Sequence, residues 1–304
     1  MDTRVSRYSF KGHAYILIAT ALWGINAPIG KQVLSYLDAT TVVGFRLCGG
    51  LMCFWLLSLF LPREHVETRD KRALLLAGIF GALLNQGLFI FGLSKTSPIN
   101  ASIITTTSPI ITMILAAIFL KEPVTQKKVL GVFIGLVGAL VLIFTNHAAV
   151  ISGQQGSIWG DIMVLIAQFS FAFYLTRFRG LIGKYSVVTL NKYMFLSSSV
   201  CILPFVFIKY QTINWVDIPQ NIWLRLAFVV VGATFLTYIL MMYAQKMLKP
   251  TMLSMYNYVQ PIVSAIYTVA IGMDTFGPDK ILAVALVFVG VYIVTTSKIN
   301  PKVK

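Results

Sequence analysis

The chain has 304 residues, of which 57% are apolar and only 12% are charged, and its mean hydropathy is +0.80. A soluble domain carries about 25% charged residues, so a single water-soluble core cannot bury this much apolar surface. The formal charge of +15 does not indicate nucleic acid as a partner, because the basic residues lie in short gaps between apolar runs. The composition therefore predicts an integral membrane protein.

Ten apolar segments follow one another along the chain, separated by short polar gaps. They cover residues 12–34, 40–61, 72–94, 98–120, 126–145, 157–177, 187–208, 221–245, 250–272 and 278–297. Each is long enough for a helix that crosses a hydrocarbon core of about 30 Å, which takes about 20 residues. Helices are expected because a lipid-exposed backbone must satisfy its own hydrogen bonds, and the runs lack the alternation of a membrane barrel. The sequence predicts an all-α membrane protein with ten transmembrane helices.

The lysines and arginines predict how these helices cross the membrane. With the N-terminus inside, 18 of the 25 basic residues fall in inner segments and 5 in outer ones. Such a bias marks the cytoplasmic side. The other two, Arg46 and Lys192, lie within predicted helices. We expect a protein of the plasma (inner) membrane, embedded in the lipid bilayer, with both termini cytoplasmic and the first apolar run kept as an uncleaved helix.

A shift of 152 residues aligns the two halves of the chain without a gap. Residues 97–142 then meet residues 249–294, so that Pro98 falls on Pro250 and Pro109 on Pro261. Two prolines at the same spacing in matching helices are hard to reach by chance, whereas aliphatic matches could follow from composition alone. The alignment therefore indicates an internal repeat.

Each half of the chain holds five predicted helices. Because five is odd, the second half must enter the membrane upside down relative to the first. We expect two inverted five-helix repeats, at residues 11–145 and 157–297. This arrangement is typical of secondary transporters, in which the site lies near the midplane and interrupted helices face it.

The stretch "TTTSP" places hydroxyls and a proline in the middle of an apolar run. Pro109 frees the carbonyl near Thr105, and a neighbouring hydroxyl or a water-filled cavity must satisfy it. One interpretation is a bent, polar-faced helix that lines a pathway. The alternative is that the hydroxyls bond back to their own helix and that small residues allow close packing. The matching polar residues before Pro261, among them Asn257, favour the cavity wall.

Two stretches of the sequence resemble a known family. The run "NASIITTTSPIITMILAAIFLKEPVTQKKVLGVFIGLVGALVLI" looks like the fourth and fifth helices of the drug/metabolite transporter superfamily, EamA branch. "GSIWGDIMVLIAQFSFAFY" at 156–174 resembles the opening of that family's second repeat. The resemblance implies a ten-helix carrier, often an exporter of amino acids or other small metabolites; some relatives move nucleotide sugars or phosphorylated sugars. The chain departs from the pattern at Asp274, where the family usually has Glu, and at Ala283, which aligns with Gly131.

Polar and aromatic residues deep in the predicted helices are the candidates for substrate binding. They are Trp23, Asn26, Arg46, Asn85, Gln86, Thr105, Ser108, Gln168, Tyr174, Tyr238, Tyr243, Tyr256 and Asn257, with Pro109 and Pro261 as helix bends. Amides and phenols suit an amino-acid-like ligand, because they bond both its ammonium and its carboxylate. The alternative is that such residues bridge helices. Arg46 and Lys192 either attract an anionic group or extend to the membrane interface.

The expected function is a secondary-type carrier that exports a small polar metabolite, amino-acid-like, by alternating access. The alternatives are a carrier of nucleotide sugars or sugar phosphates, a multidrug exporter, and a non-transport membrane scaffold or enzyme. The sequence has no GxxxxGK[ST], HExxH or GxSxG motif and no Cys/His ligand spacing, so no enzyme activity, metal or cofactor is expected. The oligomeric state is left open, with a monomer as one option.

Overall fold

The structure is a computed structural model that describes residues 3–96, 101, 104–147, 158–211, 213, 215–270 and 278–297. Parts of three expected spans, at 98–100, 102, 103, 157, 271 and 272, lie outside the described residues, and so does Asp274. Every element in the described ranges is helical. The expectation of an all-α fold is confirmed.

The helices of the first half coincide with the predicted spans to within a few residues, with two exceptions. The first helix begins earlier, and the span 98–120 is broken at Thr106 and Thr107, so that the following helix begins only at Ser108. The helices of this half are α1 (Thr3–Leu34), α2 (Ala39–Leu59), α3 (Thr68–Gly78), the π-helix η1 (Ile79–Leu84), α4 (Asn85–Lys95), α6 (Ser108–Leu120) and α7 (Gln126–His147). Asp38 caps α2, because its carboxylate accepts hydrogen bonds from the backbone N–H groups of Thr40 (2.9 Å) and Thr41 (3.2 Å).

The second half repeats this pattern and adds two short helices that the sequence did not predict, α9 and η2. Its helices are α8 (Ile158–Arg177), α9 (Arg179–Lys184), α10 (Val187–Tyr210), the 3₁₀ turn η2 (Trp215–Asp217), α11 (Gln220–Ala227), the π-helix η3 (Phe228–Leu236), α12 (Thr237–Met247), α13 (Pro250–Met255), the 3₁₀ turn η4 (Tyr256–Tyr258), α14 (Val259–Ala270) and α15 (Pro278–Thr295).

Length and apolarity qualify five helical stretches in the described residues to cross a membrane. They are Ala39–Leu59, Thr68–Lys95, Ile158–Arg177, Val187–Tyr210 and Gln220–Met247. Ser108–Leu120 and Val284–Thr295 are shorter apolar helices. Large apolar side chains such as Phe205 and Phe207 on α10 are exposed, as expected for a surface that faces lipid. The chain is an all-α membrane protein.

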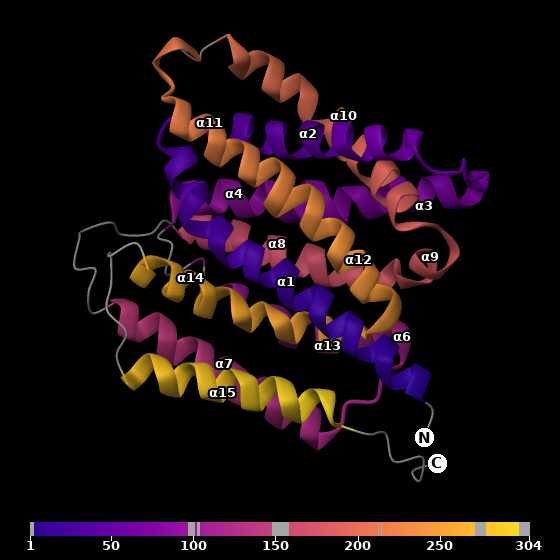
Figure 1. Ribbon diagram of the computed structural model, residues 1–304, viewed down its shortest axis with the longest axis vertical. Coiled ribbons are helices and arrows are strands. Elements are labelled where there is room, and N and C mark those ends of the chain that lie inside the picture. The colour runs from indigo at the N-terminus through magenta and orange to yellow at the C-terminus, as the bar shows by residue number, and fades with distance from the viewer. Residues whose placement is uncertain are drawn as a thin grey trace.

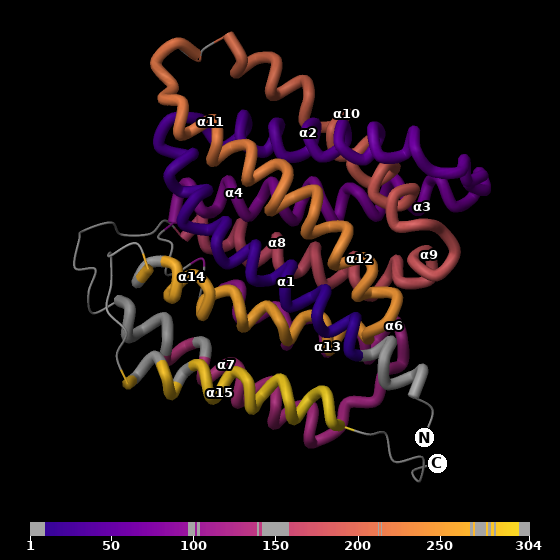
Figure 2. The backbone as a smooth tube through the Cα atoms, viewed as in Figure 1, coloured from indigo at the N-terminus to yellow at the C-terminus, as the bar shows by residue number. Residues whose placement is uncertain are grey.

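The long helices run back and forth between the same two ends of the molecule (Figures 1 and 2). The main contacts of the first helix of each half correspond when the halves are exchanged. Helix α1 packs on α12 and α14, and its counterpart α8 packs on α4 and α6. The packing therefore follows the internal repeat.

The most extensive contact joins α7 and α15, the last helices of the two halves. Glycines make this contact close: a Cβ atom added to Gly290 would lie 2.6 Å from both the Gly131 carbonyl oxygen and the Gly135 nitrogen. Small residues of this kind let membrane helices approach backbone to backbone.

Both halves interrupt the same two helices. The π-helix η1 precedes α4, and η3, which covers the aligned residues, precedes α12. The helix that contains Thr105 breaks at a turn over Thr106 and Thr107, and its counterpart breaks at η4. These last two breaks lie just before Pro109 and Pro261. Such breaks are tolerated inside a membrane only where protein or a cavity surrounds them.

Candidate functional site

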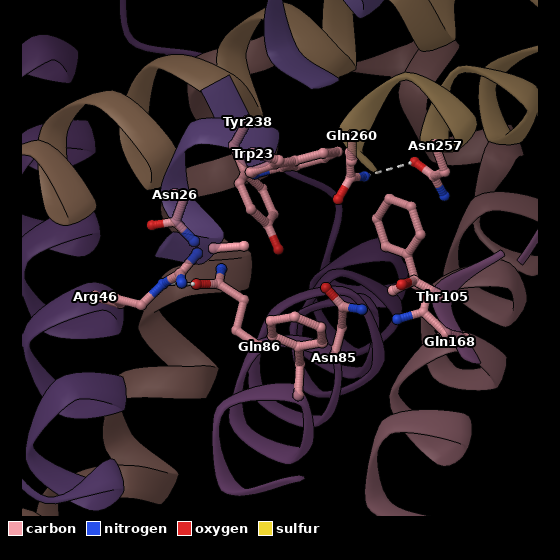
Figure 3. A pocket seen from close by; sticks show the side chains of 13 residues that line it. Trp23, Asn26, Arg46, Asn85, Gln86, Thr105, Gln168, Tyr238, Asn257 and Gln260 are labelled. Atoms are coloured by element: carbon pink, nitrogen blue, oxygen red, sulfur yellow. Dashed lines mark hydrogen bonds between the residues drawn. The ribbon is translucent and has the colours of Figure 1, made fainter. Parts of the chain in front are cut away.

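A polar cavity lies between the two halves of the chain (Figure 3). Its space free of protein atoms amounts to about 630 Å³, part of it open to solvent. The lining comprises Trp23, Asn26, Ala27, Arg46, Asn85, Gln86, Phe89 and Thr105 from the first half, and Gln168, Phe171, Tyr238, Asn257 and Gln260 from the second. Nine of the thirteen candidate residues therefore come together here. Six of the thirteen lining residues are amides, four are aromatic, and the others are Ala27, Arg46 and Thr105.

The interrupted helices bring part of this wall into place. Asn257 lies in the 3₁₀ turn η4, and Gln260 follows one turn later in α14. The Gln260 Nε2 donates to Asn257 Oδ1 at 3.1 Å, and the Asn257 Nδ2 donates to Ser108 Oγ at 3.1 Å. The two broken helices are thus joined by a chain of hydrogen bonds across the halves. This chain fixes the orientation of the Asn257 amide beside the cavity.

Thr105 satisfies both interpretations of the "TTTSP" stretch. Its Oγ1 donates to the Ala101 carbonyl at 2.8 Å, which is the local bond that the alternative required. Thr105 also lines the cavity. The proline comes after the break: Pro109 occupies the first turn of α6, where a missing N–H group leaves no bond unmade.

The π-helical turns hold the aromatic wall. Tyr238 is buried, and its hydroxyl donates to the Gly81 carbonyl of η1 at 2.7 Å. The Trp23 Nε1 donates to the Ala233 carbonyl of η3 at 3.0 Å. Trp23 meets Tyr238 edge to face. Carbonyls of the π-helices therefore fix two aromatic side chains of the cavity, and the α4 helix that follows η1 presents Asn85 and Gln86.

Arg46 lies in the cavity wall. Its side chain is 4% exposed, and its Nε donates to Gln86 Oε1 at 2.7 Å. It forms no ion pair with any acid that the structure describes. The burial of Arg46 favours the cavity wall over the alternative expectation that it extends to the interface. Lys192 differs, because it lies outside the lining with its Nζ 5.2 Å from the Trp55 ring centroid.

Two further polar atoms at the cavity are buried without a hydrogen-bond partner. They are the Oδ1 of Asn26 and the Nε2 of Gln86. Buried amide groups are normally paired, since an unmet donor or acceptor carries the full desolvation penalty. Asn85 and Gln168 also line the cavity. The Asn85 amide has a partner, because its Nδ2 donates to the Ala167 carbonyl at 3.1 Å.

Four candidate residues lie outside the lining. Ser108 accepts the hydrogen bond from the Asn257 amide described above. The Tyr174 hydroxyl donates to Gln245 Oε1 at 3.1 Å within the core. Tyr243 is 42% exposed and packs on Tyr15, and the Tyr256 hydroxyl bonds His13 Nδ1 at 2.7 Å. These residues bridge helices, as the alternative expectation had it.

The candidate set omitted four lining residues: Ala27, Phe89, Phe171 and Gln260. Gln260 carried a signal, because it is a polar residue beside Pro261 at the matched break. The three apolar residues carried none, since an apolar side chain in a membrane helix is equally compatible with lipid, core or cavity.

A polar contact joins the halves at the end of the molecule where α3 begins and α9 lies (Figure 1). Lys184 Nζ lies 2.8 Å from Asp70 Oδ2, and the Tyr185 hydroxyl donates to the same oxygen at 2.7 Å. The Ser186 N–H donates to the Glu64 carboxylate. The hydrogen bond to Asp70 raises the pKa of Lys184 above its usual value. This contact ties the two halves together away from the cavity.

Comparison with known proteins places the chain in a family. The model of the EamA-like transporter family matches it twice, at residues 10–144 and 158–296. The uncharacterized transporter YyaM of Bacillus subtilis is 24% identical over 272 residues, 88% of each chain. An uncharacterized transporter of Archaeoglobus fulgidus is 23% identical and covers 93% of this chain and 98% of its own.

More distant likenesses extend over the same length. The WAT1-related protein At5g13670 of Arabidopsis thaliana is 20% identical over 94% of this chain and 84% of its own. A crystal structure of a protein only 15% identical superposes with a TM-score of 0.75 over 95% of this chain and 96% of the other, which shows a shared fold. The chain therefore belongs to the EamA-like transporter family of the drug/metabolite transporter superfamily, and it is a membrane transporter and not an enzyme.

Proposed function

We propose that the protein is a secondary-type carrier that exports a small polar, amino-acid-like metabolite through the cavity between its halves. The observation that carries this proposal is that both halves of the chain contribute residues to the cavity wall. Polar side chains from both halves converge on one cavity, and the two interrupted helices contribute Thr105 and Asn257 to it. Secondary transporters place their sites in this way, between repeats and beside broken helices.

Alternating access is the mechanism that we propose for this cavity. The contacts of α1 with α12 and α14 correspond to those of α8 with α4 and α6 when the halves are exchanged. In Figure 1, α1 and its counterpart α8 run in opposite directions, which supports an inverted repeat. If each half can adopt the conformation of the other, a cavity open to one side becomes open to the opposite side. The contact between Lys184 and Asp70 is then a gate that closes one side.

We propose that the end of the molecule with this gate faces the cytoplasm, in the plasma membrane. The bias of basic residues, 18 against 5, supports this orientation. Helix α1 begins and α15 ends at the same side of the molecule (Figure 1), in keeping with two cytoplasmic termini.

The charge of the cavity favours a small metabolite over the alternative substrates. Arg46 is the one charged side chain among the described lining residues. Nucleotide sugars and sugar phosphates carry more negative charge and need more cations than this wall supplies. A cationic drug would meet Arg46 without an acidic partner in the described wall.

The proposal is tested by exchange in proteoliposomes. Purified protein is reconstituted with an internal mixture of amino acids, and entry of each radiolabelled amino acid is measured. Ala27→Trp is expected to abolish exchange, because its indole fills the cavity, whereas Leu17→Trp on an exposed face of the same helix leaves exchange intact. Exchange that persists in Ala27→Trp would contradict the proposed pathway.

A further inference from the structure

Three buried side chains gather on one side of the cavity. Arg46 on α2, Gln86 on α4 and Asn26 on α1 are each no more than 5% exposed. Figure 3 shows the amides of Asn26 and Gln86 beside the guanidinium of Arg46. The bond from Arg46 Nε to Gln86 Oε1, at 2.7 Å, fixes the rotation of the Gln86 amide.

The positive charge of Arg46 has no counter-ion among the described residues. The ion pairs in the described ranges involve Lys128 and Lys184, both away from the cavity. A buried charge without a partner is strongly unfavourable, and intramembrane cations normally pair or mark a substrate pathway. The arginine fork matches a carboxylate in shape as well as in charge.

The two amides beside Arg46 define the rest of the ligand. Gln86 offers an N–H donor beside the Tyr238 hydroxyl, and Asn26 offers a carbonyl acceptor without a partner. A ligand that satisfies all three groups must accept bonds from Arg46 and Gln86 and donate one bond to Asn26. A carboxylate with an N–H or O–H group on the neighbouring carbon has this pattern.

We propose that Arg46, Gln86 and Asn26 form the subsite for the carboxylate end of an α-amino or α-hydroxy acid. Arg46 and Gln86 bind the carboxylate, and Asn26 accepts the hydrogen bond of the α-ammonium or α-hydroxyl group. The rest of the ligand lies along Trp23 and Phe171 and toward the neutral amides, so its side chain is uncharged. This inference rests on the proposed function, because it names the ligand class of the same cavity.

The test compares acids with their carboxylate-free analogues. The melting temperature of the purified protein is measured with each standard amino acid and with 3-phenyllactate, at about 10 mM, because a ligand of the folded state stabilises by RT ln(1 + [L]/Kd). Each acid that binds is then replaced by its methyl ester and by its decarboxylated amine. We expect the ester and the amine to bind at least roughly tenfold more weakly than the acid. Phenylalanine against 3-phenyllactate distinguishes the α-amino from the α-hydroxy class.

Variants separate the charge from the fold. Arg46→Gln is expected to weaken acid binding by roughly 10- to 100-fold, and Arg46→Lys to restore part of it, because the charge returns without the fork. The matched control is Lys192→Gln, which removes a cation from α10 outside the cavity and leaves binding unchanged. If Arg46→Gln does not fold, the ester comparison on the wild-type protein still decides.

The subsite is overturned if esters or amines bind as tightly as the acids, or if Arg46→Gln binds the acids with wild-type affinity. It is also overturned if no amino or hydroxy acid binds or is exchanged. In each case the carrier proposal stands separately, provided that some other small metabolite is exchanged and Ala27→Trp blocks that exchange.

Discussion

Replacing Gly290 by alanine should destabilise the protein through the contact between α7 and α15. The new Cβ would lie 2.6 Å from the Gly131 carbonyl oxygen and from the Gly135 nitrogen, about 0.8 Å short of ordinary contact at 3.4 Å. Both neighbours are backbone atoms, so no side-chain rotation relieves the clash and the helices must separate. Overpacking of this kind costs about 1–3 kcal/mol. We expect Gly290→Ala to melt several degrees below the wild-type protein.

The assay is thermal unfolding in detergent, followed by intrinsic fluorescence. The matched control is Gly30→Ala on α1, because a Cβ at Gly30 meets no atom within 4 Å. That change is neutral or slightly stabilising, since alanine favours a helix over glycine by about 0.5–1 kcal/mol. A Gly290→Ala variant as stable as the Gly30→Ala control would refute the close packing of the two last helices.

Two further predictions concern the site and the gate. Ser108→Ala removes the hydroxyl that accepts the hydrogen bond from Asn257 at 3.1 Å, without changing the cavity lining itself. Exchange should show a KM raised several-fold with little change in maximal rate. An unchanged KM would show that other contacts hold Asn257 in place. The hydrogen bond to Asp70 raises the pKa of Lys184, so its stabilising contribution is present below the usual lysine pKa of 10.5 and is lost as pH rises through the higher folded value. Melting temperatures at alkaline pH should therefore fall more in the wild-type protein than in Lys184→Gln; parallel curves would exclude a stabilising gate.

The helices were predictable because the membrane imposes a length on them. Apolar runs of about 20 residues gave spans that agree with the described helices, apart from the start of α1 and the breaks before Pro109 and Pro261. The repeat followed from residue identities alone. The positions of η1 and η3 were not predictable, since a π-helix is one hydrogen-bond register away from an α-helix and no residue in either segment demands it.

The site was predictable in part, for a geometrical reason. The position of a polar residue within an apolar run predicts how deep it lies in the membrane. The direction in which its side chain points depends on how its helix is rotated against its neighbours. Tyr174 and Tyr256 lie at the right depth and point to Gln245 and His13. Arg46 was ambiguous from its depth, and only the packing of α2 against the rest of the fold places it in the cavity wall.

The central claim is that the cavity opens to each side of the membrane in turn. It is tested by labelling a Gln168→Cys variant, in a background in which Cys48, Cys53 and Cys201 are serine, since none of the three lines the cavity. A membrane-impermeant maleimide is applied to right-side-out and to inside-out vesicles, with and without substrate. The account predicts labelling from both sides, and slower labelling when substrate occupies the cavity. Labelling from one side only under every condition, or no labelling from either side, would contradict it.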